Sequence, residues 1–288
     1  MVIPKTVVTD AATIPPQQEL NLYWIPALAG IHLGAVAALW ETSWAAVGVC
    51  VLLHALCGGF GMCVGYHRLL THRSFKCPLW LEYTLALLGA LCLQGDPAEW
   101  TAQHRKHHQH ADEPGDPHSA RQGFWWSHML WLLWAPPKES RRAIARRYAP
   151  DLLQVPFYVS LERWHRWLTL LLAALLFALG GWPFVVWGVF VRLVLTYHCT
   201  WLVNSGGHAF GSTRYPTNDL STNCWWVALI SYGEGWHNNH HAFPTSARHG
   251  LMFWEIDFAY GFIRLFKALG LAWDVMTPPA ERLKAAAQ

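Results

Sequence analysis

The stretch WAAVGVCVLLHALCGGFGMCVGYHRLLTH, residues 44–72, is apolar over most of its length and ends in a histidine-rich segment. No Lys, Arg, Asp or Glu occurs before Tyr66, after which His67, Arg68 and His72 follow closely. At about 1.5 Å per residue, the apolar part is long enough to cross a hydrocarbon core of about 30 Å as a helix. The stretch therefore predicts a membrane-spanning helix with a pair of imidazoles at one end.

Three further apolar stretches extend this pattern. The first is separated from residue 44 only by the turn ETS at 41–43, and the other two are joined by GGWP at 180–183. The sequence thus predicts an all-α integral membrane protein with four transmembrane helices, at about residues 22–40, 44–66, 164–179 and 182–203. We expect residues 22–288 to form a single domain and residues 1–21 to form a flexible N-terminal arm without the features of a secretory signal.

The basic residues predict the orientation in the membrane. Twelve Lys or Arg lie between His67 and Arg163, and the two hairpin turns contain none. By the positive-inside rule, both large polar segments, 67–163 and 204–288, are cytoplasmic, with both termini on that side. The apolar stretches 79–93 and 124–134 are expected to be buried or interfacial helices, because a span at 79–93 would separate the histidines onto opposite sides.

The composition agrees with a membrane protein and singles out histidine. Apolar residues make up 53% of the chain and charged residues 14%, against about 25% charged in soluble proteins. The seven Cys show no metal or disulfide spacing, and a net charge of +3 without a basic stripe excludes a nucleic-acid partner. Seventeen His nearly equal the 18 acidic residues. Histidine chemistry is therefore the feature to explain.

Three histidine clusters carry that chemistry. HRKHH and HNNHH each have the spacing i, i+3, i+4, which on a helix predicts three imidazoles that converge on one point. The i, i+5 pair of HRLLTH would lie about 140° apart, so its rings straddle a site or the helix ends between them. Eight histidines exceed the four ligands of a single metal, and therefore predict two metals rather than solvated surface residues. The clusters are His67 and His72; His104, His107 and His108; His237, His240 and His241.

A fourth element, NSGGH at 204–208, follows the last predicted span. His208 is a candidate ninth ligand, and Asn204 is a candidate partner for a metal-bound water. Ligating histidines usually donate their second N–H to a carboxylate or carbonyl. The candidate acids are Asp96, Glu99, Asp116 and Glu234. The lone histidines within apolar stretches are expected to be hydrogen-bonded packing residues instead: His32, His54, His165 and His198.

From about Trp24 to Pro279 the chain resembles the membrane-bound fatty acyl desaturases of the delta-9 type, the family of stearoyl-CoA desaturase. The motifs HxxxxH, HxxHH, NxxxH and HxxHH occur in the family's order, within the segments GYHRLLTHRSF, DPHSARQGFWWSH, TWLVNSGGHAFG and GEGWHNNHHAFP. The resemblance implies a cytosolic helical cap, formed by residues 67–163 and 204–288, that holds two iron ions. It also implies a bacterial inner membrane as the location. By motif position it implies as ligands His67, His72, His104, His107, His108, His208, His237, His240 and His241, with Asn204 acting through water.

The resemblance also implies a bent acyl tunnel and a reaction. Gln94, Trp100 and Thr200 match the positions that kink the tunnel, and Ala55 and Gly59 match its closed end. The implied activity is O2-dependent insertion of a cis double bond into a saturated acyl chain at the delta-9 position. The alternatives are a di-iron lipid hydroxylase and, less in keeping with ligands at helix ends on one side, a membrane metal transporter.

The implied partners are an acyl chain, O2 and a separate electron donor. Ala102 and Gln103 stand where acyl-CoA members carry an Arg-Asp pair, and FPTSARHGLMFWEIDF at 243–258 is similar to bacterial and cyanobacterial members. We therefore expect the acyl chain of a glycerolipid rather than of acyl-CoA. A ferredoxin-like donor is expected to dock on the basic segment KESRRAIARRY at 138–148, whose alternative role is ordinary positive charge beside anionic membrane lipid.

Overall fold

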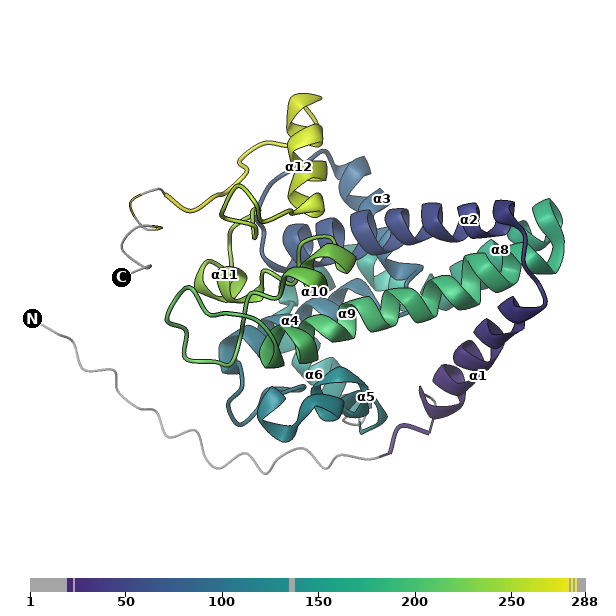
Figure 1. Ribbon diagram of the computed structural model, residues 1–288, viewed down its shortest axis with the longest axis horizontal. Coiled ribbons are helices and arrows are strands. Elements are labelled where there is room, and N and C mark those ends of the chain that lie inside the picture. The colour runs from purple at the N-terminus through teal and green to yellow at the C-terminus, as the bar shows by residue number, and fades with distance from the viewer. Residues whose placement is uncertain (1–19, 23, 135–137, 280, 282, 284–288) are drawn as a thin grey trace, which may run out of the picture.

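The computed structural model describes residues 20–22, 24–134, 138–279, 281 and 283, and the regular elements within this part are all helical (Figure 1). The predicted arm at 1–21 lies almost wholly outside the described residues. The elements are α1 (Trp24–Val36), η1 (Ala37–Leu39), α2 (Trp44–His54), η2 (Ala55–Thr71), α3 (Leu79–Ala90), α4 (Pro97–His110), η3 (Ala120–Gln122), η4 (Trp126–Leu130), α5 (Trp131–Leu133), α6 (Lys138–Tyr148), α7 (Pro150–Leu153), α8 (Pro156–Val185), η5 (Val186–Val191), α9 (Arg192–Ala209), α10 (Trp225–Ile230), α11 (His237–Ala242) and α12 (Phe258–Ala268).

Two helical stretches have the length and composition of membrane-spanning helices: Trp44–Thr71 and Pro156–Ala209. The second reverses direction at Gly181, whose φ of 68° is a left-handed conformation that glycine adopts without steric cost. A Cβ at Gly188 would lie 2.7 Å from Leu176 Cδ1, so the two halves pack antiparallel at close range. The first predicted span differs, because α1 and η1 together cover only Trp24–Leu39 and form a shorter apolar helix.

The helix η2 is wound with π-type turns and carries the first histidines out of the apolar bundle. It packs against α3 at backbone distance, since a Cβ at Gly61 would lie 2.4 Å from the Gly89 nitrogen. Leu81, Leu85 and Ala86 of α3 are buried. The stretch 79–93 therefore forms a helix packed on the bundle, as predicted, and 124–134 forms the short helices η4 and α5.

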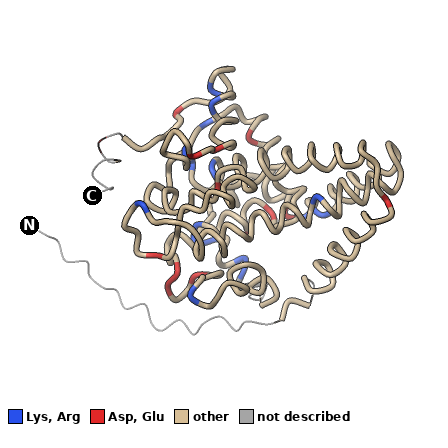
Figure 2. Tube along the Cα trace, viewed as in Figure 1, with Lys and Arg blue, Asp and Glu red and all other residues tan. Residues whose placement is uncertain are grey.

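Charged residues gather at the end of the molecule that contains α4, α6, α11 and α12, called the cap below, and the long arms of α2, α8 and α9 carry few of them (Figure 2). At the cap end, Arg68 is fully buried and forms ion pairs with Glu234 and Asp257, at 3.1 and 2.9 Å. Its Nη1 also donates to the Ala247 carbonyl at 2.7 Å. Because burying a charge is costly unless it is paired, this network fixes the C-terminal loops against η2.

A second buried arginine lies within the apolar arms. Arg192 of α9 is fully buried, and it donates from Nε to the Gly188 carbonyl and from Nη1 to the Leu91 carbonyl at the end of α3. These bonds satisfy a carbonyl that the end of α3 leaves free. The residue therefore joins α9 to α3 below the cap.

Candidate metal centre

The cap brings all nine predicted histidines together in two adjacent groups. In each group, one ring nitrogen from every member lies within 4.8 Å of those of the other members. The five-histidine group consists of His67, His72, His104, His108 and His240, and the four-histidine group consists of His107, His208, His237 and His241. The groups touch, since the rings of His108 and His241 have centroids 4.7 Å apart. Helices η2, α4, α9 and α11 supply eight of the side chains, and His72 caps the end of η2.

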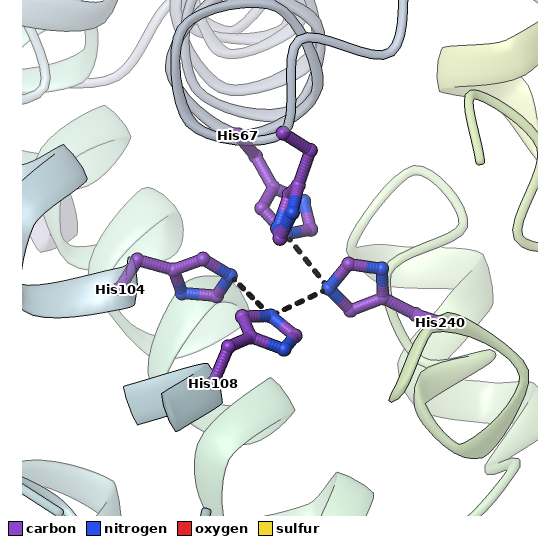
Figure 3. A group of neighbouring side chains, drawn as sticks. His67, His104, His108 and His240 are labelled. Carbon is purple, nitrogen blue, oxygen red and sulfur yellow. Dashed lines mark hydrogen bonds between the residues drawn. The ribbon is translucent and has the colours of Figure 1, made fainter. Parts of the chain in front are cut away.

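The prediction that each i, i+3, i+4 triplet converges on one point was wrong. His104 and His108 enter the five-histidine group, whereas His107 turns to the four-histidine group. Neighbouring positions on a helix diverge by about 100°, so His107 and His108 face different points while i and i+4 remain within about 40°. Four members of the five-histidine group converge in Figure 3. The Nε2 atom of His240 lies 3.2 Å from His67 Nε2 and 2.9 Å from His108 Nε2. Each triplet therefore contributes to both groups.

The two histidines of HRLLTH reach the same group because of the π-type winding. The His72 nitrogen donates to the His67 carbonyl at 3.1 Å, an i to i+5 bond that widens the last turn. The helix ends at Thr71, and His72 caps it. As a result the two rings lie with centroids 4.8 Å apart rather than on opposite sides of the helix.

Buried carboxylates orient the four-histidine group. The Nδ1 atoms of His107, His208 and His241 donate to carboxylates at 3.0, 2.9 and 2.8 Å, respectively. These carboxylates belong to Asp116, Asp112 and Asp219. With the proton held on Nδ1, each ring presents the lone pair of Nε2, which is the arrangement typical of metal-bound histidine.

The five-histidine group has its own acid, Glu234. Its Oε2 accepts from His67 Nδ1 at 2.7 Å and lies 3.1 Å from His249 Nδ1, while Oε1 pairs with Arg68. Among the four acids expected to serve this role, Asp116 and Glu234 contact histidines. The other two do not: Asp96 caps α4 by accepting from the Ala98 and Glu99 nitrogens, and Glu99 pairs with Arg141.

Burial keeps the imidazoles neutral, and hydrogen bonds from the histidines keep their carboxylate partners charged. Desolvation, followed by the neighbouring imidazoles, lowers the pKa of His104, His108 and His240 well below the usual value. The pKa of His241 is lowered to about 4 by desolvation, although Asp219 opposes the shift. Burial alone would raise the pKa of Asp112, but the hydrogen bond from His208 holds it below the usual range. Neutral imidazole is the form that binds metals.

Several ring nitrogens of the two groups have no hydrogen-bond partner and are therefore available to bind metal ions. The Nε2 atoms of His72, His107, His208 and His241 are buried without a hydrogen-bond partner in the protein. Nitrogen lone pairs that face one another in a buried site repel unless a cation or proton lies between them. Two groups of neutral imidazoles with bare nitrogens therefore fit two transition-metal ions.

Three cavities follow one another toward the two groups. The largest, about 890 Å³, is a groove whose walls include α1 and α8, and it shares Trp24, Gly95 and Tyr197 with a second cavity of about 80 Å³. The second cavity in turn shares lining residues with a third of about 60 Å³, which reaches His67 and His237. The shared residues are Trp100, His104, Thr200 and Asn204. The three cavities therefore adjoin one another in a row from the groove to the histidines, and this row is called the path below.

The residues predicted to kink a tunnel meet at the middle of this path. Gln94 Nε2 donates to Thr200 Oγ1 at 3.1 Å, and the Trp100 ring stacks on His104 with centroids 5.1 Å apart. Asn204 lines both smaller cavities.

The far end of the path differs from the sequence-based expectation. It is lined by His54, Gly58 and Tyr232 rather than by Ala55 and Gly59. A Cβ at Gly59 would lie 3.2 Å from Phe262, so this face packs on α12. The π-type turns that begin at Ala55 change which positions share a face of the helix.

Sequence reasoning missed four residues of the site: Asp112, His118, Asp219 and His249. His118 stacks near His107 and lines the second cavity, and His249 is fully buried with its ring centroid 4.3 Å from that of His240. Asp112 lies two residues beyond His110 and was identifiable by nearness to the second cluster. Asp219 and His249 lie in loops without a repeating pattern, and no sequence signal marks them. The lone histidines are hydrogen-bonded as expected, since His165 Nδ1 donates to the Leu161 carbonyl and His54 Nδ1 is bonded to Thr196 Oγ1. Two of them are more than packing residues, because His54 lines the third cavity and His165 lines the groove.

Comparison with known proteins agrees with this geometry. The family model described as fatty acid desaturase matches residues 42–264. An Anabaena variabilis protein named sn-1 stearoyl-lipid 9-desaturase is 49% identical over 267 residues, covering 91% of this chain and 97% of its own. A Nostoc protein named sn-2 palmitoyl-lipid 9-desaturase is 49% identical over 87% of this chain and 88% of its own. An Anemone leveillei protein named acyl-CoA 5-desaturase AL21 is 46% identical over 90% of this chain and 80% of its own. The chain therefore belongs to the fatty acid desaturase family.

Proposed function

We propose that this protein is an O2-dependent acyl-lipid desaturase that inserts a cis double bond at the delta-9 position of a saturated acyl chain carried by a glycerolipid. The observation that carries the proposal is the path of cavities that runs past two groups of bare imidazole nitrogens. Relatives named as lipid 9-desaturases, at 49% identity, support the acyl carrier and the position of the bond.

The nine histidines are the proposed ligands of two iron ions, with Asn204 acting through a bound water. Iron with O2 supplies an oxidant strong enough to remove hydrogen from an unactivated methylene, which no side chain can do. Asp112, Asp116, Asp219 and Glu234 hold the imidazole protons away from the metal side. The expected stoichiometry is one O2, two electrons and two protons per double bond, with two waters formed.

The walls of the path decide which methylenes react. A constriction lies beside His104. It is formed by the hydrogen bond from Gln94 to Thr200 and by the stacked ring of Trp100. A chain threaded through it is held with a fixed pair of carbons next to the histidines, and a bend there favours the cis product. Positioning of this kind is the main contribution that a protein makes to a reaction whose chemistry comes from its metals.

We further propose the four-span arrangement with a cytosolic cap, in a bacterial inner membrane. The reversal at Gly181 gives Pro156–Ala209 two crossings, and Trp44–Thr71 gives a third. At about 1.5 Å per residue, Trp24–Leu39 measures about 24 Å, slightly less than a hydrocarbon core of about 30 Å. Exposed Trp40 and Trp44 at its far end are suited to the interface.

Electrons are proposed to arrive from a ferredoxin-like protein on the cytosolic face.

The experiment that tests the function is analysis of fatty acids, by gas chromatography, from a heterologous host that expresses the chain. New cis-9 monounsaturated chains in glycerolipids support the proposal. Hydroxylated chains without new double bonds would assign the same centre to a lipid hydroxylase instead.

A further inference from the structure

The wide groove at the start of the path opens between two helices that we place in the membrane. Trp24, Ala27 and Ile31 of α1 form one wall, with the i, i+3, i+7 spacing of a single helix face. Thr169 and Leu170 of α8 form part of the opposite wall. Helix α1 packs on η5 and α9, and it diverges from the other long helices in Figure 1. The apolar walls extend over about two helical turns, or about 10 Å.

Arginines surround the end of the groove nearest the cap. Three of these arginines lie on α6 and two near the start of α8, and three acidic residues line the same groove. The arginines are Arg141, Arg142, Arg146, Arg163 and Arg166, and the acidic residues are Asp96, Glu99 and Glu162. Arg141 pairs with Glu99 at 3.2 Å, and Arg142 pairs with Glu162 at 2.9 Å. Arg146 and Arg163 are exposed and make no ion pair within the part of the chain that the structure describes. The rim therefore carries an excess of positive charge.

Two polar atoms in the groove lining are buried without a partner. Arg141 Nε at the rim and Thr169 Oγ1 on the wall have no hydrogen bond within the protein. Buried polar groups are almost always paired, so such atoms indicate a ligand or ordered water. A guanidinium beside an apolar wall matches a ligand that is anionic at one end and apolar at the other.

We propose that the groove binds the phosphate diester and the second acyl chain of a glycerophospholipid, while the first acyl chain enters the narrow cavities. This inference rests on the proposed function, which assigns the narrow cavities to an acyl chain. A glycerolipid carries two chains on one glycerol, and the narrow path holds only one. The second chain must remain in the bilayer, which requires an opening at the side of the protein. An acyl-CoA carries a single chain and requires no such opening.

The test measures lipid binding directly, on the full chain purified in detergent, by native mass spectrometry. The probes are dipalmitoyl phosphatidylglycerol, a monogalactosyldiacylglycerol with the same chains, and stearoyl-CoA. The double variant Arg146→Gln, Arg163→Gln is expected to bind phosphatidylglycerol at least about tenfold more weakly and the neutral galactolipid unchanged, because charge-assisted bonds to phosphate are lost. Both side chains are exposed, so the variant is expected to fold normally.

The matched control is Arg147→Gln, on the same helix α6. The Arg147 guanidinium lies over the Tyr148 ring at 5.4 Å and does not line the groove, so binding of phosphatidylglycerol should not change. If the control and the double variant weaken phosphatidylglycerol binding equally, the arginines of the rim act only as general surface charge, and the proposal is overturned. Unchanged phosphatidylglycerol binding, or a loss confined to stearoyl-CoA, would also overturn it.

If the groove does not bind phospholipid, the result differs from the result expected if the protein is not a desaturase. Fatty acids resolved by lipid class, from a host that contains both phospholipid and galactolipid, separate the two. A wild-type chain that forms no double bond in any class contradicts the desaturase function. Equal desaturation of phospholipid by the wild type and the double variant contradicts only the role of the arginine rim.

Discussion

Replacement of Asp112 by Asn tests whether the carboxylates set the proton positions of the histidines. Asp112 Oδ2 accepts from His208 Nδ1 and from the Leu220 nitrogen, each at 2.9 Å. Its Oδ1 accepts from the Ala120 nitrogen at 2.8 Å. All of its close contacts are therefore donors, and a side-chain amide has only one oxygen to offer them.

Either orientation of the new amide carries a penalty. If the amide oxygen faces His208, the NH2 group opposes the Ala120 N–H, which costs about 1–3 kcal/mol for an unsatisfied buried group. If the NH2 group faces His208, the ring must accept on Nδ1 and carry its proton on Nε2, which removes the lone pair from the metal side. Loss of an orienting partner typically weakens metal binding by about 10–100-fold, or about 1.4–2.7 kcal/mol.

The assay is iron content per chain, by elemental analysis, after purification and dialysis at a series of free iron concentrations. We expect Asp112→Asn to lose iron at concentrations that saturate the wild type. The matched control is Asp96→Asn, since Asp96 is also buried but caps α4, and Asn is as good a cap as Asp. Normal iron binding by Asp112→Asn, with a normal melting temperature, would show that Asp112 does not set the proton position of His208.

Three further predictions follow from the same structure. His240→Ala should abolish product while the protein stays in the membrane fraction, and retained desaturation would remove His240 from the ligand set. Trp100→Ala should widen the constriction and mainly shift the position or yield of the double bond, so an unchanged product pattern would contradict its role. Although burial opposes the shift, Arg105 and Arg73 lower the pKa of Asp151 to about 2, below the unfolded value of about 3.9. Asp151 therefore adds stability above about pH 4 that is lost as the pH falls toward 2, so Asp151→Asn should flatten the acid dependence of the melting temperature; parallel curves would contradict this.

Much of the site could be predicted because its chemistry lies in local patterns. Each cluster of histidines occupies a few consecutive positions, and all nine residues converge in the structure. Their division between two groups could not be taken from spacing alone. It depends on where the axis of α4 lies relative to both groups, which is a property of packing rather than of sequence.

The carboxylates show the same limit more clearly. Nearness in sequence favoured Asp96, but the residue that contacts His208 is Asp112, and the one that contacts His241 is Asp219. The loop that carries Asp219 returns to α11 only through tertiary contacts, including the hydrogen bond from Asn238 Nδ2 to the Tyr215 carbonyl. The π-type winding of η2 is likewise absent from any residue pattern. It nevertheless decides that His67 and His72 share one group.

We propose that two metals beside a narrow acyl path desaturate a glycerolipid chain. Gas chromatography with mass spectrometry of fatty acids from a host expressing the chain, resolved by lipid class and with the double bond located, tests this reaction and its carrier together. We expect cis-9 monounsaturated chains in glycerolipids, absent with His240→Ala. Hydroxylated chains without new double bonds would contradict the reaction, and double bonds confined to acyl-CoA would contradict the acyl carrier.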